Sequence, residues 1–248
     1  MRIVEGSEFT TEKGRMTFGY DKKERVQDAI SFRAAPQTHG GVRDTIQWLE
    51  NLLEEEISSV SYKINPIIGY ALDLIAIALA DLGNISERRS FRLTDSSLSY
   101  GLPMNLVGTD SDYNHGFPVV QACATAVLGE LKLLAIPAVA ISTINTNNNE
   151  YNCTTYMSGM KLLEAVSLLA KVFSIEMLMG AQAIDLAKDK LKGFKLGAGT
   201  HSALEEFRKT VKVTREDRFV RPGMVEANRL IEEDIVLHAV EKSIGELD

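Results

Sequence analysis

A short polar stretch, residues 25–40, has the residue types of a ligand-binding segment. It contains Arg33, whose planar guanidinium can hold a carboxylate through two parallel hydrogen bonds, the geometry that an amino acid offers. For an arginine judged by its type alone, a surface position or a surface ion pair is the commoner role. Arg33 is therefore a candidate carboxylate-binding residue, and the sequence around it decides how strong a candidate.

A second polar segment, residues 142–155, carries an acid at the end of a run of amides, because three asparagines precede Glu150. A carboxylate in such a place can pair with a ligand cation or with an imidazole, whose protonated form it favours. The simpler alternative is a solvated carboxylate beside an asparagine-rich turn. We expect this segment and residues 27–37 to be loops or first turns of helices, where proteins commonly present functional groups.

The residues around Arg33 resemble the substrate-binding signature of the histidine and aromatic amino acid ammonia-lyases, V-Q-D-x-Y-S-x-R-x-x-P-Q. The matching positions are Val26, Gln27, Asp28, Ser31, Arg33, Pro36 and Gln37. Shorter matches follow in the family's order at 82–89 (L-G-N-I-S-E-R-R), 95–103 (D-S-S-L-S-Y-G-L-P), 114–117 (N-H-G-F), 175–176 (I-E), 182–186 (Q-A-I-D-L), 197–200 (G-A-G-T) and 217–218 (D-R). Each is short, but in this order they extend the resemblance over most of the chain.

The resemblance implies roles for four residues. Arg33 is expected to hold the substrate carboxylate, and Gln27 to form hydrogen bonds in the same pocket. Histidine ammonia-lyases carry Asn-Gln-Glu where this chain has Asn148, Asn149 and Glu150. Glu150 is therefore expected to recognise the substrate's ring or amine, with Asn149 in place of the usual glutamine. Arg33 and Glu150 are the predicted catalytic residues, and no metal ligand is predicted.

The sequence departs from the family pattern at the catalytic tyrosine of the signature, which is Ile30 here. An isoleucine cannot donate, accept or transfer a proton. The aromatic residue that usually precedes the next long apolar helix is also replaced, by Lys63 and its neighbours. Lys63 is either a new polar residue of the pocket or, as is commoner, a surface lysine. Histidine therefore cannot be assumed as the substrate.

The resemblance covers only the C-terminal half of the family. The Ala-Ser-Gly triplet that forms the electrophilic methylidene-imidazolone group (MIO) is missing, and the single Ser-Gly pair, Ser158 and Gly159, follows a methionine. Because the active sites of the family are assembled from several subunits of a tetramer, we expect an N-terminal subunit bearing Ala-Ser-Gly to supply MIO. Self-association into a tetrameric core is also expected.

The apolar periodicity predicts an almost wholly helical chain. Helices are expected over 42–58, over 67–82 with Gly83 as a left-handed cap, and over 117–135, where Pro137 stops the helix. Further helices are expected over 154–190, 201–211 and 224–244. The 154–190 helix would exceed roughly 50 Å at 1.5 Å per residue, which indicates a bundle built by several subunits. The fold class is all-α, a long-helix bundle of the ammonia-lyase (fumarase/aspartase-like) type, with residues 1–248 as a single helical domain.

The composition is that of an ordinary globular protein, with 248 residues, 45% of them hydrophobic, and a net charge of -7. It lacks a concentrated basic block, so no nucleic acid or membrane partner is expected. Residues 66–82 are apolar but short for a membrane span and contain Asp73. Two cysteines and a polar start without the apolar core of a signal peptide favour the cytoplasm.

Two hypotheses from different classes follow. The first is the C-terminal subunit of a two-subunit, histidine ammonia-lyase-like enzyme that is inactive alone, and the sequence does not distinguish elimination from a 2,3-amino shift. The second is a non-catalytic, lyase-derived binding or regulatory protein, which Ile30 favours. Membership of the fumarase and aspartase superfamily is disfavoured, because its G-S-S-x-M-P-x-K-x-N signature is absent.

Overall fold

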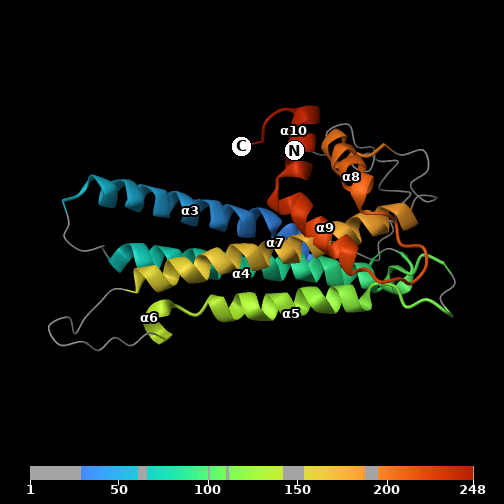
Figure 1. Cartoon of the computed structure of the whole chain (residues 1–248), viewed down its shortest axis with the longest axis horizontal. Coiled ribbons are helices and arrows are strands. Elements are labelled where there is room, and N and C mark those ends of the chain that lie inside the picture. Colours follow the sequence, from blue (N-terminus) through green and yellow to red (C-terminus); the bar gives the residue numbers. More distant parts are fainter. Residues whose placement is uncertain are drawn as a thin grey trace. The chain divides into compact units, whose positions relative to one another are not determined.

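The computed structural model describes residues 29–60, 66–99, 101–109, 112–141, 154–187 and 195–247. Within these ranges the chain is helical and contains no strand, which confirms the all-α class (Figure 1). The elements are α2 (Ile30–Arg33), α3 (Ala35–Ser58), α4 (Pro66–Thr94), the 3-10 helix η3 (Met104–Leu106), α5 (Pro118–Leu134), α6 (Ala138–Ile141), α7 (Thr155–Leu186), α8 (Ala198–Thr210), α9 (Arg221–Glu232) and α10 (Ile235–Ile244).

The chain divides into two compact units. Of the described residues, Ala29 and those within 88–123 and 173–247 form the first unit, and those within 30–87 and 124–172 form the second. The boundaries fall inside α4, α5 and α7, so each of these long helices contributes residues to both units. The single helical domain over 1–248 stays a prediction.

The second unit is built on α4, α5 and α7, which lie side by side in Figure 1. Their closest approach is at Gly83, where a Cβ would lie 2.9 Å from the Leu131 side chain and 3.4 Å from Leu128 and Leu169. The prediction that Gly83 ends its helix is wrong. α4 continues to Thr94, and the glycine lets two neighbouring helices approach its backbone instead of reversing the chain.

Helix α4 is long and apolar enough to cross a membrane by length and composition, since its most apolar window has a mean hydropathy of 1.6. However, 56% of that window is buried within the structure. Asp73 and Glu87 on this helix are also buried and have protein partners: Ala138 N–H and Lys161 for Asp73, and the Thr125 hydroxyl for Glu87. These observations support the interpretation of α4 as a core helix.

In the first unit, the single helix predicted over 224–244 is two helices, and that prediction is wrong. The chain breaks between α9 and α10 at Asp234, whose φ of 54° is left-handed. Asp234 N–H donates to Ile231 O at 3.1 Å, which closes the last turn of α9. Aspartate adopts this conformation more readily than most residues, and the break turns α10 so that it packs on α8.

The other helices agree with the periodicity, with differences at their ends. α3 begins at Ala35, seven residues before the predicted start, because Pro36 is well suited to the first turn of a helix. α7 covers the predicted 154–190 helix as far as Leu186, and residues 188–190 lie outside the described part. At 1.5 Å per residue α7 is roughly 50 Å long.

Candidate functional site

The described part of the signature covers the single turn α2 and the start of α3, where Pro36 and Gln37 lie. Ile30 and Arg33, three residues apart on α2, share one face of the helix, and both are exposed, Ile30 to 66%. Ser31 between them is buried. Ile30 therefore belongs to the surface that presents Arg33 and not to the core. Gln27, the other substrate-binding residue predicted here, lies outside the described residues, as does Lys63.

The second predicted site segment, with Asn149 and Glu150, also lies outside the described residues, but the structure describes the chain on both sides of it. On the N-terminal side, Ala138 N–H donates to Asp73 Oδ2 at 2.7 Å. Lys161 Nζ forms an ion pair with Asp73 Oδ1 at 3.1 Å and also donates to Ile136 O. The side chains of Lys161 and Asp73 are only 10% and 6% exposed. A buried ion pair therefore holds the backbone on both sides of Pro137.

On the C-terminal side, Thr155 begins α7 in close contact with Gly69 of α4. A Cβ on Gly69 would lie 3.0 Å from Thr155 Oγ1 and 3.2 Å from Thr155 Cα. Gly69 and Asp73 are one helical turn apart on α4, so both ends of the intervening segment attach to the same face of this helix. We call these five contacting residues the loop base: Gly69, Asp73, Ala138, Thr155 and Lys161.

The loop base was not predicted from the sequence. Its visible signal was one acid, Asp73, in the middle of an apolar run, and a buried charge requires a partner. The partner, Lys161, is 88 positions away and sits in an unremarkable helical pattern. Only the packing of α4 against α7 brings the two together.

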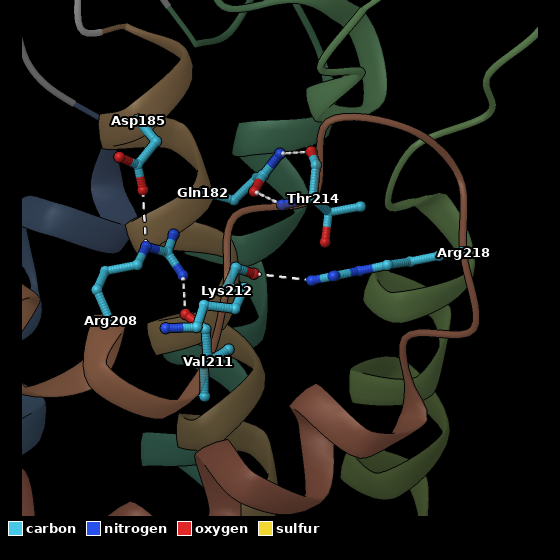
Figure 2. A network of polar contacts seen from close by, with 7 residues as sticks. All are labelled: Gln182, Asp185, Arg208, Val211, Lys212, Thr214 and Arg218. Carbon is cyan, nitrogen blue, oxygen red and sulfur yellow. Dashed lines mark hydrogen bonds and ion pairs between the residues drawn. The ribbon is translucent and has the colours of Figure 1, made fainter.

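In the first unit, residues 211–218 form a non-helical segment that side chains hold in place (Figure 2). The buried Gln182 amide forms two hydrogen bonds with the Thr214 backbone, Nε2 to O at 2.7 Å and N to Oε1 at 3.1 Å. Arg208 pairs with Asp185 at 2.7 Å and donates to Val211 O at 3.0 Å. The Gln182 and Arg208 side chains therefore bind backbone groups of Thr214 and Val211 that helix hydrogen bonds leave free. We call residues 211–218 the strap.

The predicted N-H-G-F and D-R motifs meet in this unit. Asp217 accepts hydrogen bonds from the N–H groups of His115, at 2.6 Å, and Gly116, at 3.0 Å, and its own N–H donates to Asn114 Oδ1 at 2.7 Å. The two backbone N–H groups hold the pKa of the Asp217 carboxyl below its usual range. Gly116 has a φ of 76°, and a Cβ there would lie 2.3 Å from Asn105 O. These motif residues join two loops and are not arranged as a catalytic set.

The S-E-R-R and I-E motifs also meet in the first unit. Arg89 of α4 contacts Glu176 of α7 through two guanidinium nitrogens, with Nη2 to Oε2 at 2.8 Å. This two-point geometry is the strong form of an arginine–carboxylate pair. Both side chains are largely buried, so the pair ties the two helices together.

A cavity of about 300 Å³ lies in the first unit beside residues 211–218. Apolar side chains line it together with Thr210, Lys212, Thr214, Arg218 and Glu226. Arg33, the predicted site residue that the structure describes, is not among the residues that line it. Arg218 Nη2 donates across to Lys212 O at 2.9 Å, and Arg229 lowers the pKa of Glu226 by hydrogen bonding to its carboxylate. Among the described residues, no group of three His, Cys, Asp or Glu side chains could hold a metal ion.

The sequence profile of the aromatic amino acid lyase family matches residues 1–209. The chain belongs to this family. The chain is 33% identical to histidine ammonia-lyase of Alkaliphilus oremlandii, in an alignment that covers 98% of this chain and 48% of that protein. The predicted family resemblance is confirmed.

Solved structures of the family have the same fold. Tyrosine aminomutase from Streptomyces globisporus aligns with a TM-score of 0.86 and 26% identity, over 99% of this chain and 51% of that one. Histidine ammonia-lyase from Trypanosoma cruzi aligns with a TM-score of 0.78 and 26% identity, over 98% of this chain and 49% of that one. The chain thus spans about half the length of the relatives it matches, and it has the long-helix fold of the lyase family's C-terminal half.

The family depends on MIO, and the residues of this chain do not fit the formation of that group. Its 248 residues contain no Ala-Ser-Gly. The single Ser-Gly pair lies inside α7, where the buried Ser158 donates its hydroxyl hydrogen to Thr154 O at 3.2 Å. A serine and glycine fixed in regular helix are not placed for cyclisation, so an MIO group would have to come from residues other than these.

Proposed function

We propose that this chain is the C-terminal subunit of a two-subunit amino acid ammonia-lyase of the histidine ammonia-lyase type, located in the cytoplasm. Its partner would be an N-terminal subunit that carries Ala-Ser-Gly and therefore MIO. The observation that carries the proposal is that 98% of the chain matches histidine ammonia-lyase over 48% of the relative's length, while the triplet is absent from its sequence. Alone, the chain would not eliminate ammonia.

In this proposal the chain supplies substrate-binding groups. Arg33 would hold the substrate carboxylate through two hydrogen bonds, and its exposed position on α2 suits a site that another chain completes. Gln27 would form hydrogen bonds in the same pocket. Glu150 would accept from the amine or ring of the substrate, with Asn149 beside it. The electrophile and the base that removes the substrate proton would belong to the partner.

The proposal includes self-association, because two rows of apolar side chains in the second unit are exposed. On α7, Tyr156, Met160, Leu163 and Val166 recur at helical spacing and are 50% to 81% exposed. On α4, Tyr70, Leu74 and Ile77 recur in the same way and are 41% to 49% exposed. Apolar rows of this length on two long helices are typical of surfaces that other helices cover. A tetrameric core would cover them.

Co-expression tests the proposal. The chain is produced together with an Ala-Ser-Gly-bearing lyase fragment encoded beside it, and complex mass, the ultraviolet absorbance of MIO and ammonia release from histidine, tyrosine and phenylalanine are measured. Changing the partner's triplet serine to alanine is the matched control and should abolish both the absorbance and the activity. Product analysis separates an α,β-unsaturated acid, the lyase product, from a β-amino acid, the aminomutase product.

Two results would contradict the two-subunit proposal. One is the absence of both a complex and activity on any amino acid. The other concerns the protein taken from its own cells and detected under denaturing conditions with an antibody against this chain. A polypeptide mass twice the 27.4 kDa of the chain would show that the two halves are one polypeptide.

A second candidate function is favoured by Ile30. With an isoleucine where the family has its catalytic tyrosine, the chain would be a non-catalytic binding or regulatory protein. Calorimetry discriminates between the two candidates. Binding of an amino acid by this chain alone, together with inactivity of the co-expressed complex, would favour the second.

A further inference from the structure

The cavity beside the strap has an apolar inner end. Phe117, Leu178 and Val211 line it and are only 1%, 5% and 2% exposed, so they form its buried part. Its volume of about 300 Å³ is at the lower end of the range for pockets that hold small organic molecules. Covering apolar surface is favourable, so this end of the cavity suits the apolar body of a small ligand.

The outer end of the same cavity is cationic. Lys212 and Arg218 line it and are exposed, and Glu226 is the one acid among the described lining residues. Arg218 Nη2 donates to Lys212 O at 2.9 Å, and Lys212 Nζ donates to Lys209 O at 3.2 Å. Neither cation forms an ion pair within the described part of the chain, so both retain N–H donors for an anion.

The Glu226 carboxylate is already used by protein groups. Its two oxygens accept from the Arg229 guanidinium, at 2.7 Å and 3.0 Å, and the Thr210 hydroxyl also forms a hydrogen bond with it. Because this acid is paired, it does not provide a site for a ligand amine. The lining therefore favours an anion over a cation or a zwitterion.

Two further features of the cavity favour a negative charge. Thr214 is 8% exposed, and in Figure 2 its hydroxyl, which has no hydrogen-bond partner among the described residues, points towards the Arg218 side chain. Helix α9 also begins at the cavity, since Val220 and Pro222 line it, and no side chain caps this helix. The free N–H groups of a first helical turn stabilise a nearby anion.

We propose that this cavity is a binding site for a small organic monocarboxylate with an aromatic or branched aliphatic body. The body would lie against Phe117 and Val211 at the buried end. The carboxylate would accept hydrogen bonds from Arg218, Lys212 and the Thr214 hydroxyl. An inorganic anion would match the outer end only and leave the apolar end uncovered.

Phenylacetate is the first probe, titrated into the full chain with calorimetry and methyl NMR. We expect a dissociation constant of about 1 mM or tighter. Phenylacetamide keeps the ring without the charge and should bind at least tenfold more weakly. Methyl signals of Leu178, Val211 and Val220 should shift, whereas those of Leu131 and Leu169 in the second unit should not.

Three results of this titration would overturn the proposal. The first is equal binding of the acid and the amide, which would mean that the charge is not recognised. The second is inorganic phosphate binding as tightly as phenylacetate, which would mean that the apolar end contributes nothing. The third is a set of methyl shifts that leaves out Leu178, Val211 and Val220.

Charge variants test the outer end of the cavity. Arg218→Met should weaken phenylacetate binding about tenfold, and Lys212→Met should weaken it by a smaller factor. The matched control is Arg221→Met, which removes an exposed arginine that does not line the cavity and should change the affinity less than about twofold. An unchanged affinity in Arg218→Met would overturn the proposal.

A substitution at Gly223 tests the apolar end without removing a charge. Gly223 lines the cavity, and a Cβ there would lie 3.7 Å from the Val211 side chain, an ordinary contact. Gly223→Ala should therefore fold and is the control, whereas Gly223→Leu should fill the space and lower the affinity at least tenfold. Thermal unfolding checks that both variants are folded. Undiminished binding in folded Gly223→Leu would contradict the site, and if that variant does not fold, Arg218→Met decides.

These measurements use the chain alone, so a co-expressed complex without lyase activity would not change their outcome. Arg33→Met separates this cavity from the predicted substrate site, because it removes the arginine expected to hold the substrate carboxylate. Phenylacetate binding should be the same in Arg33→Met as in wild type. Loss of binding in that variant would place the probe at Arg33 and overturn the proposal.

Discussion

The Gln182 side-chain amide binds the backbone of Thr214 through two hydrogen bonds, Nε2 to O at 2.7 Å and N to Oε1 at 3.1 Å. The pairing resembles one rung of a sheet, with a side chain in place of the second strand. Gln182 is 1% exposed and Thr214 8%, so water does not replace these bonds readily. A helix thereby fixes a segment that has no regular structure of its own.

Replacing this amide should destabilise the first unit. In Gln182→Leu, the buried N–H and C=O of Thr214 lose their partners, and an unsatisfied buried polar group costs about 1–3 kcal/mol. We expect the free energy of unfolding to fall by roughly 2–4 kcal/mol in urea titrations. In Gln182→Glu the free energy of unfolding should fall by a similar amount, because a carboxylate oxygen would face Thr214 O and neither oxygen can donate a hydrogen bond. A loss below about 0.5 kcal/mol in both variants would show that the Gln182 hydrogen bonds do not stabilise residues 211–218.

Replacing a helix glycine by alanine should change the stability of the fold differently at Gly129 and at Gly83. An alanine in place of an interior helix glycine gains about 1 kcal/mol from propensity. At Gly129 of α5 nothing lies within 4 Å of the added Cβ, so Gly129→Ala should stabilise by roughly that amount. At Gly83 the added Cβ lies 2.9 Å from the buried Leu131 side chain, and overpacking offsets the gain.

Thermal unfolding of the two glycine variants, compared side by side, checks this difference. Gly83→Val should lower the melting temperature further, since it adds two more methyl groups to the same contact. Equal stabilisation by Gly83→Ala and Gly129→Ala would mean that the helices are not in contact at Gly83.

The Asp217 carboxylate should give the first unit an acid-sensitive stability. The N–H groups of His115 and Gly116 lower its folded-state pKa from the usual 3.8. A lowered folded-state pKa stabilises the fold above the unfolded-state value and loses that contribution as the pH falls through the folded-state pKa. The difference in unfolding free energy between wild type and Asp217→Asn should therefore be constant from about pH 5 to 7 and shrink towards zero in stronger acid.

Urea titrations at a series of pH values measure that difference. Asp95→Asn is a useful comparison, because Ser97 likewise lowers the pKa of Asp95 but within a local turn. If the difference in unfolding free energy between wild type and Asp217→Asn grew as the pH fell, the pKa of Asp217 would not be lowered in the folded state.

Arg33→Lys should impair substrate binding in the co-expressed complex. Lysine keeps the charge but cannot form two parallel bonds with a carboxylate, so KM should rise about tenfold, equivalent to about 1.4 kcal/mol. Because Arg33 is exposed, the melting temperature of the chain alone should not change. Arg43→Lys, on the exposed surface of α3, is the control and should leave KM unchanged. An unaltered KM in Arg33→Lys would remove Arg33 from the site.

Ile30→Tyr should increase activity if the missing phenol limits turnover. Ile30 is 66% exposed, so a tyrosine can be accommodated without disturbing the core. We expect kcat of the complex to rise at least tenfold and the unfolding free energy to stay within about 0.5 kcal/mol of wild type. A complex that is already fast with Ile30 and unaffected by tyrosine would mean that proton transfer uses another group.

The helical pattern was readable from the sequence where apolar spacing was regular, as in α5 and α7. The apolar spacing could not show that Gly83 packs against neighbouring helices. In sequence, a glycine that ends a helix looks the same as a glycine that a neighbouring helix contacts closely. The break at Asp234 was also hidden, since apolar spacing continues through it into Val236 and Val240.

The candidate site was only partly predictable for a similar reason. Arg33 and Glu150 stood out because they sit in recognisable local motifs. Asp73 and Lys161 carry no such motif, and their meaning depends on a contact between positions 88 residues apart. Local sequence shows which groups can bind a substrate, whereas a contact between distant positions is known only once the helices are packed.

The loop base also has a consequence for how this lineage can change. Its two anchors on α4 are four residues apart, roughly 6 Å along the helix axis. One turn of one helix therefore carries the contacts to both Ala138 and Thr155. A single substitution that shifts this turn would disturb both contacts in one evolutionary step.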